Sequence, residues 1–455
     1  MDPLDSQVAG SALGSTISRR TILRGVLAAG IAIPATQLLA GCGGKSGAKT
    51  NDKAGTLSMT AWEAYPDQIR ANLTKFKDQF GSAVDLSLIP NVGYGPALQT
   101  RLQGGQEIDA FYNFAYASTK YVDAGWATSL NKYPGVEDLI ADMFPAAAAR
   151  HRLPDGRIIS VPYFSAVHSL MYNESHLKKY GITAAPTTKE EVYDQCKKLK
   201  AAGVSSPYAA YWTKQFLEEY FLVYLLGEGI TAFDDKGGPA FADDPKTEGV
   251  MQWWKAMYQD GLTSKDVLTA DPGAHVTAMA QGHSTFFELH HYFLQIVRTT
   301  DGPESKNVTI SYRSPGPSGK TLQVGEVIQM GAKVGGQRAQ DAWNLLKFYG
   351  WKDKSGSYST FTSWAKSAAL LGPYPGLFKD KDFLAAFPSY FDMAKLEDAF
   401  ANRSDVVPAR VTPWYASFQV KVGDRLQAML LGQSSIKDTI SSLASDANSL
   451  ASASR

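Results

Sequence analysis

Cysteine is nearly absent from this 455-residue chain, which contains only Cys42 and Cys196. No Cys-x-x-Cys pair occurs and neither cysteine lies beside histidines at zinc-ligand spacing, so the sequence predicts no disulfide scaffold and no structural metal. Net charge is also small, because 45 Lys and Arg are matched by 44 Asp and Glu. Proteins that bind nucleic acids usually carry a basic excess that neutralises phosphates. We therefore expect no nucleic-acid partner, no metal and no cofactor.

The composition shows no strong bias. Apolar residues make up 44% of the chain and charged residues 20%, proportions that exclude a wholly disordered, a fibrous or a polytopic membrane protein. The length suits two or three domains, each with its own buried core.

The first forty residues have the order of an export signal. Arg19, Arg20 and Arg24 form a basic block, and an uncharged segment then leads to Leu-Ala-Gly-Cys, which ends at Cys42. The uncharged segment is interrupted by polar residues and is weaker than the ~20 strongly apolar residues of a membrane-spanning helix. We predict a signal peptide over residues 1–41, and an N-terminal anchor helix is the alternative.

The end of this segment resembles a bacterial lipobox, and Arg19-Arg20 resembles a twin-arginine export signal, although Ile22 stands where Phe is usual. These resemblances imply cleavage before Cys42 and a lipid on its thiol, which would hold the protein at the outer face of the cytoplasmic membrane or in the periplasm. Whether export uses the twin-arginine or the general route stays open. Residues 42–54, rich in Gly, Lys and Ser, would be the lipidated tether.

Cleavage would leave an electrically neutral protein. The signal peptide removes three Arg and two Asp, so 42 basic and 42 acidic residues remain. Such a balance favours an uncharged ligand, although a local charged patch could still attract a charged one.

Strand-like and helix-like segments alternate through the remaining chain. The predicted strands span 56–62, 84–89, 108–112, 158–163, 308–312 and 322–331, and the predicted helices span 66–80, 94–102, 189–201, 216–226, 247–260 and 337–349. Repeated βα units indicate an α/β fold with a mainly parallel sheet covered by helices. Two such lobes with a ligand cleft between them would suit this length.

Aromatic residues gather in the loops that follow the predicted strands, next to polar side chains. Aromatic faces pack against the C–H groups of sugars, while Glu, Asn and His bind sugar hydroxyls. The candidate ligand-binding residues are Trp62, Glu63, Tyr65, Tyr94, Asn113, Tyr116, Phe164, Tyr211, Trp212, Glu288, His290, Glu326 and Trp364.

Other roles for these residues stay open. Any of the aromatic residues could be part of the core, and the glutamates could cap a basic group on an amino sugar. Glu63, Glu288 and Glu326 could also be the carboxylates of a glycan hydrolase. Glu288, His290 and His291 lack the His-Glu-x-x-His spacing of a zinc protease.

The order of segments in the middle of the chain resembles the solute-binding proteins of ABC importers, the family that includes maltose- and oligosaccharide-binding proteins. The segments that carry the resemblance are DGRIISVPY at 155–163, SLMYN at 169–173, LKKYGI at 177–182 and PTTKEE at 186–191. The sequence departs from the family pattern at Lys189, where Trp is usual, and over 283–292 and 364–375.

This resemblance implies a periplasmic-binding-protein-like fold of type II, with two α/β lobes, a hinge and a ligand cleft between the lobes. Residues 55–164 and 316–354 would form lobe 1, and 165–315 and 355–455 would form lobe 2, with crossings near Phe164, Ser314 and Lys354. The protein would be a monomer that binds a small neutral carbohydrate, closes around it and delivers it to an ABC permease without covalent chemistry. The alternatives are a secreted lipoprotein glycan hydrolase and a lipoprotein adhesin or scaffold.

Overall fold

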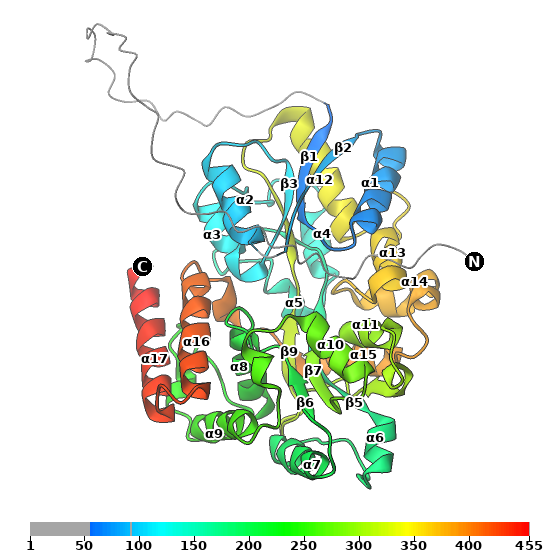
Figure 1. The fold of residues 1–455 in the computed structure, drawn as a ribbon. Helices are drawn as coiled ribbons and strands as arrows, with labels where there is room; N and C mark the ends of the chain where they lie inside the picture. The colour runs from blue at the N-terminus through cyan, green and yellow to red at the C-terminus, as the bar shows by residue number, and fades with distance from the viewer. Residues whose placement is uncertain (1–54, 92, 455) are drawn as a thin grey trace, which may run out of the picture. The chain divides into compact units, whose positions relative to one another are not determined.

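A computed structural model describes residues 55–91 and 93–454 of the chain. The predicted signal peptide, Cys42 and the tether lie outside these residues. The described part is an α/β structure with two sheets (Figure 1), so the predicted fold class is confirmed. Within it, no helix is both long and apolar enough to span a membrane.

The first sheet has the strand order β2-β1-β3-β10-β4. Its strands are β1 (Leu57–Trp62), β2 (Val84–Ile89), β3 (Ala110–Asn113), β4 (Val161–Pro162) and β10 (Val327–Met330). Strand β1 is parallel to β2 and β3, as repeated βα units predict, whereas β10 is antiparallel to both β3 and β4.

The second sheet has the order β11-β9-β5-β7-β6, and β8 also pairs with β5. Its strands are β5 (Ala166–Asn173), β6 (Tyr208–Ala210), β7 (Phe286–His290), β8 (Val308–Ile310), β9 (Thr321–Val324) and β11 (Ser404–Asp405). Strand β5 is antiparallel to β7, β8 and β9. The prediction of a mainly parallel sheet is therefore wrong for this half, because distant segments return beside β5 without a βα crossover.

Helices cover both sheets (Figure 1). The longer ones are α1 (Pro66–Phe80), α2 (Tyr94–Gln103), α7 (Lys189–Ala201), α8 (Leu217–Gly227), α9 (Lys246–Gln259), α10 (Pro272–Ala280), α12 (Gly336–Gly350), α13 (Ser359–Ala368), α16 (Tyr415–Leu430) and α17 (Ile436–Ala453). The shorter ones are α3 (Ser118–Asp123), α4 (Val136–Ala141), α5 (Pro145–Ala148), α6 (Glu174–Lys179), α11 (Phe293–Thr299), α14 (Lys381–Ala386) and α15 (Met393–Asp398). Single turns are η1 (Ala115–Ala117), η2 (Ala240–Ala242), η3 (Lys265–Leu268), η4 (Ser305–Asn307), η5 (Pro375–Lys379), η6 (Ala399–Arg403) and η7 (Pro408–Val411).

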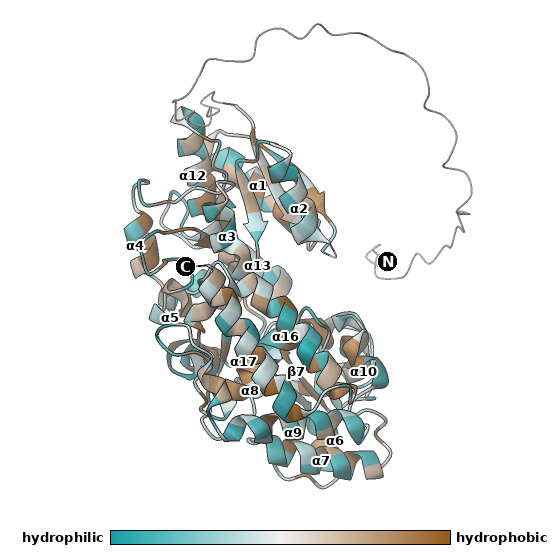
Figure 2. Ribbon diagram, turned by 90° about the vertical axis from the view of Figure 1, so that its left-hand side faces the viewer, coloured by the Kyte–Doolittle hydropathy of each residue, from teal (hydrophilic) through white to brown (hydrophobic). Residues whose placement is uncertain are grey.

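Local sequence signals explain where several helices begin and end. Helix α1 starts with Pro66 and stops at Gly81, whose positive φ of 82° suits a residue without a side chain. Helix α7 begins with a capping box, in which Thr188 and Glu191 exchange hydrogen bonds at the first turn. Figure 2 shows hydrophilic and hydrophobic residues mixed along α7 and α9, as expected of helices with one buried face.

The predicted strand 322–331 is two strands that belong to different sheets. Strand β9 pairs with β5 in the second sheet, and β10 pairs with β3 in the first. The change of sheet falls on Gly325 and Glu326 rather than near Ser314. A Cβ on Gly325 would lie 2.2 Å from the carbonyl oxygen of Phe164, so only glycine fits where the two connections between the sheets pass each other.

The other changes of sheet are also visible in the strand pairing. The chain leaves the first sheet after Pro162 and enters the second at Ala166. Helix α13 still lies against the first sheet's helix α1, where Gln68 Nε2 donates to Ser363 Oγ over 2.6 Å. The third crossing therefore comes after α13 and before β11, later than Lys354. The division into two lobes stays a prediction.

Candidate functional site

Three aromatic rings stack where two strands of the first sheet end. Trp62 closes β1, Phe114 follows β3, and Tyr116 lies in η1. The ring centroids of Trp62 and Phe114 are 5.6 Å apart with 19° between their planes, and those of Phe114 and Tyr116 are 5.4 Å apart with 9° between their planes. We call Trp62, Phe114 and Tyr116 the aromatic stack. The three rings partly cover one another and Trp62 is buried. The half-buried rings of Phe114 and Tyr116 are therefore the members on which sugar C–H groups can pack.

A groove begins at this stack. It is lined by Phe114 and Tyr116 together with the predicted residues Tyr94 and Asn113, and on the opposite side by Gln419 of α16. Asn113 and Tyr94 are buried and already hydrogen-bonded to Gln329 and to the backbone of Phe114 and Tyr112. Gln215 also lines the groove and is exposed, so its amide group can donate to and accept from a polyhydroxylated ligand.

A second group of rings surrounds Trp364 of α13. The Trp364 ring makes edge contacts with Tyr65 and Tyr163, at centroid distances of 6.1 and 5.6 Å. Tyr65 is 40% exposed and adopts a positive φ of 52° just before α1. Tyr163 also touches Trp62 and Phe164, so the two aromatic groups are continuous.

Glu326 connects the first sheet's loops to the link between β9 and β10. Its carboxylate Oε2 accepts a hydrogen bond from the backbone N–H of Ala115 at 2.8 Å, and its backbone carbonyl accepts one from Tyr163 at 2.7 Å. Burial raises the pKa of Glu326 to about 8. Its carboxyl group is therefore mostly protonated at neutral pH and can donate a hydrogen bond to a ligand.

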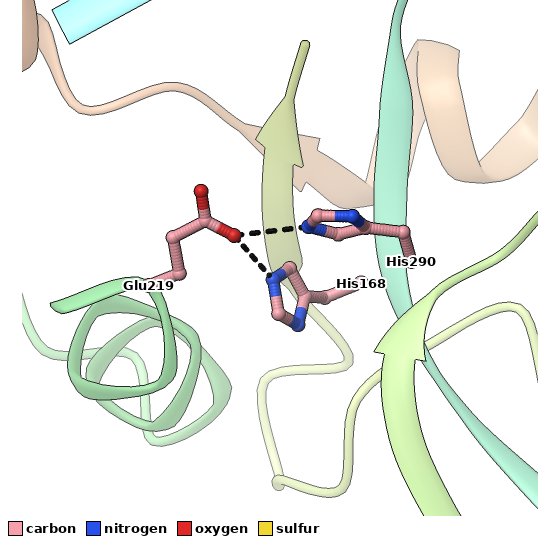
Figure 3. A group of neighbouring side chains, drawn as sticks. All are labelled: His168, Glu219 and His290. Carbon is pink, nitrogen blue, oxygen red and sulfur yellow. Dashed lines mark hydrogen bonds and ion pairs between the residues drawn. The ribbon is translucent and has the colours of Figure 1, made fainter. Parts of the chain in front are cut away.

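A buried polar cluster lies beside β5 and β7 (Figure 3). His168 and His290 face each other across the paired strands, and both rings approach Oε2 of Glu219 on α8, with Nε2 at 3.1 and 2.9 Å. Burial lowers the pKa of His168 to about 4. Burial alone would raise the pKa of Glu219, but hydrogen bonds from the two rings hold that pKa well below its usual value, so Glu219 is ionised at neutral pH.

The same cluster has the donor set of a metal site. One ligand atom each from His168, Glu219 and His290 lies within 4.8 Å of the others, and two imidazoles with one carboxylate suit zinc. The hydrogen bonds above also account for the arrangement without an ion, so the absence of a metal stays a prediction.

Arg410 in η7 completes the cluster. Its guanidinium Nη2 lies 3.2 Å from both Glu218 and Glu219, and its Nε lies 3.1 Å from Glu218. Glu218 also accepts a hydrogen bond from the hydroxyl of Tyr415. The arginine is 12% exposed and both carboxylates are nearly or fully buried, so Arg410 balances their charge away from bulk solvent.

Some predicted residues gather at this place. Trp62 and Tyr116 belong to the aromatic stack, Tyr94 and Asn113 line the groove, and His290 belongs to the polar cluster. Phe164 joins them through an edge contact with Tyr292, whose hydroxyl lies 3.1 Å from Nδ1 of His290.

Other predicted residues lie elsewhere. Trp212 is fully buried and packs on Tyr208, Tyr220 and Trp254, so it is a core residue. Tyr211 packs on Phe216 at a centroid distance of 4.4 Å. Glu63 is exposed.

Glu288 is buried inside the second sheet and accepts a hydrogen bond of 2.5 Å from the hydroxyl of Tyr208. Burial raises its pKa to about 7. All five residues of β7 are buried.

Sequence reasoning missed the charged residues of the polar cluster. Glu218 and Glu219 stand inside the otherwise apolar helix α8, and His168 stands in the buried strand β5. A charge within an apolar run was the available signal, because buried charges persist where they have partners or a function. Arg410 comes from a segment that gave no such signal.

Comparison with known proteins assigns the class. Residues 60–290, just over half of the chain, match the bacterial extracellular solute-binding protein family, and the chain belongs to this family. It is 23% identical over 275 residues to a probable ABC transporter-binding protein of Deinococcus radiodurans, covering 59% of this chain and 63% of the relative. It is also 23% identical over 288 residues to the erythritol/L-threitol-binding protein of Mycolicibacterium smegmatis, covering 54% and 60%. The chain thus spans about three fifths of the length of these curated relatives.

The fold is similar to that of maltose-bound MalE3 of T. maritima, with a TM-score of 0.76 and 21% identity over 87% of this chain and 100% of that one. At this identity the likeness shows the fold, which is of the type II periplasmic-binding-protein class. The predicted family and fold are confirmed.

Proposed function

We propose that this protein is the substrate-binding component of an ABC importer, which captures a small carbohydrate or polyol and delivers it to a membrane permease. The observation that carries the proposal is the aromatic stack, which lies beside a groove with amide groups and beside the carboxyl of Glu326. Parallel apolar faces next to hydrogen-bonding groups are the complement of a polyhydroxylated carbon chain.

The relatives support the same ligand class. One is an erythritol/L-threitol-binding protein, and a protein of similar fold holds maltose. A polyol and a disaccharide share a chain of hydroxyl groups but differ in size, so these names support the class and leave the size of the ligand open.

Export and anchoring are part of the proposal. The lipobox at Cys42 would place the mature protein at the membrane surface, where a permease can accept the ligand-bound form. Expression of a Cys42→Ser variant in a bacterial host tests this. We expect the variant to leave the membrane fraction while the unchanged chain stays there, and equal membrane retention of both would contradict lipidation.

Thermal unfolding tests ligand binding. The mature chain, residues 42–455 with Cys42→Ser, is melted alone and with sugars and polyols of one to three units. Binding to the native state alone adds RT ln(1 + [L]/Kd), about 2.7 kcal/mol at a hundredfold excess over Kd. We expect one ligand class to raise Tm and to be recovered unaltered by chromatography. No shift with any member would contradict the carbohydrate assignment.

A glycan hydrolase is the second candidate. Glu326 has a pKa raised to about 8, and a carboxyl that stays protonated at neutral pH is what the acid of a glycosidase needs. The recovery step decides between the two functions, since cleavage products in place of the intact ligand would favour the hydrolase.

A further inference from the structure

Arg150 is a buried arginine whose hydrogen-bonding capacity is mostly unused. It follows α5, is 6% exposed, and donates from Nη2 to Ser165 Oγ over 2.7 Å. Its Nε and Nη1 have no hydrogen-bond partner among the described residues. The structure also gives it no ion pair there, whereas Arg410 is paired with two glutamates. A guanidinium carries five N–H donors, and leaving several of them without acceptors in a buried place is costly.

A cavity of about 10 Å³, which has room for one water-sized group, adjoins this arginine. Arg150 and Arg410 line it together with Tyr116 and Gln323, and valines of the 406–411 segment complete the wall. Gln323 on β9 is 1% exposed, and neither its amide nitrogen nor its amide oxygen has a partner within the described part of the chain. Two buried side chains with free polar atoms therefore border one cavity, next to the last ring of the aromatic stack.

The charges around this cavity leave Arg150 without a counter-ion. Burial, and next the charge of Arg410, lower the pKa of Arg150 to about 10, so the guanidinium is still charged at neutral pH. The carboxylates of Glu218 and Glu219 form ion pairs with Arg410. Glu326 is the other acid that acts on Arg150, and its pKa of about 8 leaves it mostly uncharged at pH 7.

We propose that Arg150 and Gln323 form an oxyanion subsite, and that the transported ligand is a sugar or polyol derivative that bears a phosphate or a carboxylate group. This inference rests on the proposed function, because it assigns the charge of the ligand that the aromatic stack and the groove would hold. One oxygen of a phosphate or carboxylate group would occupy the water-sized cavity. Its negative charge and lone pairs match the free N–H groups of Arg150 and the amide of Gln323. The neutral charge of the whole protein does not oppose this, since the subsite is a local feature.

Matched pairs of ligands test the proposal on the mature chain, residues 42–455 with Cys42→Ser. Isothermal titration compares erythritol with its 4-phosphate, glycerol with its 3-phosphate, glucose with its 6-phosphate, and glucose with glucuronate. We expect at least one anionic compound to bind at least ten-fold more tightly than its neutral parent. This difference in affinity should become smaller in 0.5 M NaCl. The three phosphates and glucuronate show whether the subsite prefers a phosphate or a carboxylate group.

Variants assign the effect to the subsite. We expect Arg150→Gln to lower the affinity for the anionic ligand at least ten-fold and to change the affinity for the neutral parent by no more than about two-fold. The affinity of Arg150→Lys for the anionic ligand should lie between those of wild type and Arg150→Gln. Arg152→Gln is the matched control, because Arg152 lies two residues on and pairs with Glu137 at the surface. It is expected to leave both affinities unchanged. The comparison of anionic with neutral ligands needs no substitution at Arg150. It therefore tests the oxyanion subsite even if Arg150→Gln fails to fold.

The outcomes separate this inference from the proposed function. If neutral sugars or polyols bind and their anionic derivatives bind no better, the oxyanion subsite is refuted while the proposed function stands. Equal losses of neutral and anionic ligands in Arg150→Gln would also refute it. If no neutral or anionic compound binds, both proposals fail.

Discussion

The backbone N–H of Ala115 donates to the carboxyl oxygen of Glu326 over 2.8 Å, across the two sheets' connecting segments. Ala115 belongs to the turn that carries Tyr116, while Glu326 is half of the two-residue link between β9 and β10. One side chain therefore fixes the position of the aromatic stack relative to the place where the chain changes sheet.

Glu326 should make the protein less stable as pH rises. Its pKa is raised to about 8 in the folded protein, above the ordinary value near 4.3 of an unfolded chain. The unfolded state therefore loses the proton first, and the free energy of unfolding falls between about pH 4.5 and 8. We expect Glu326→Gln, whose amide oxygen can still accept from Ala115, to gain roughly 1 to 3 kcal/mol over wild type between pH 5 and 8. Urea unfolding of both proteins at pH 5 and pH 8 measures this gain in the free energy of unfolding. The same difference between variant and wild type at both pH values would contradict the raised pKa.

Tyr116 and Trp212 should separate ligand binding from folding. Tyr116 ends the aromatic stack and lines the groove, so Tyr116→Ala should weaken a carbohydrate ligand about ten-fold, which is ~1.4 kcal/mol. Trp212 is fully buried among aromatic residues, so Trp212→Phe should cost about 1 to 3 kcal/mol of stability and leave affinity unchanged. Titration calorimetry and thermal melts measure both. If Trp212→Phe lost much affinity and Tyr116→Ala lost none, Trp212 would be the ligand-binding residue and Tyr116 would not.

Gly325 should tolerate no side chain. A Cβ there would lie 2.2 Å from the carbonyl oxygen of Phe164 and 2.9 Å from Cα of Ser165, so Gly325→Ala must shift backbone. We expect a loss of about 3 kcal/mol or more. Gly81→Ala is the control, because Gly81 also has a positive φ but has no atom within 4 Å of the new Cβ. Its loss should stay near ~1 kcal/mol. Equal Tm values for the two variants would show that the crossing is looser than described.

His151 should contribute to acid unfolding. Burial, and next the charge of Arg150, lower its pKa to about 3, whereas an unfolded histidine takes up a proton near pH 6.5. The unfolded state therefore binds the proton first, and stability is lost as pH falls below about 6.5. We expect His151→Asn, whose amide can replace Nδ1 in its contact with Ser160, to lose about 2 kcal/mol less than wild type between pH 7 and 5. Parallel stability curves for the two proteins would exclude a neutral buried His151.

Periodicity predicted most of the regular structure. The predicted helix over 66–80 and the strand over 84–89 have the bounds of α1 and β2, and the buried helix near 216–226 is α8. Local signals suffice there, because turn residues and hydrophobic spacing act within a few residues of each other. They fail at 322–331, where both halves favour a strand and the change of sheet at Gly325 accompanies the close approach of the Phe164 backbone.

The candidate site was less accessible to sequence reasoning. The sequence predicts that Trp62 and Tyr116 lie near each other, because they stand at or just after the ends of neighbouring parallel strands, and such ends converge. Arg150, Glu219 and Arg410 come from three separate elements, and their proximity depends on tertiary packing that no single segment records. Trp212 also follows a strand, and the sequence around it does not show whether its side chain lies in the core or in a binding site.

The aromatic stack and the polar cluster come from separate segments of the chain. The stack comes from residues 62–116, whereas Glu219, His290 and Arg410 come from the second sheet and the elements that follow it. Under the proposed function, substitutions in the polar cluster would alter the pattern of hydroxyl groups or charge that is recognised and leave the aromatic stack unchanged. If that function holds, the ligand preference of such a protein could change by point substitutions in one set of segments while the other set stays as it is.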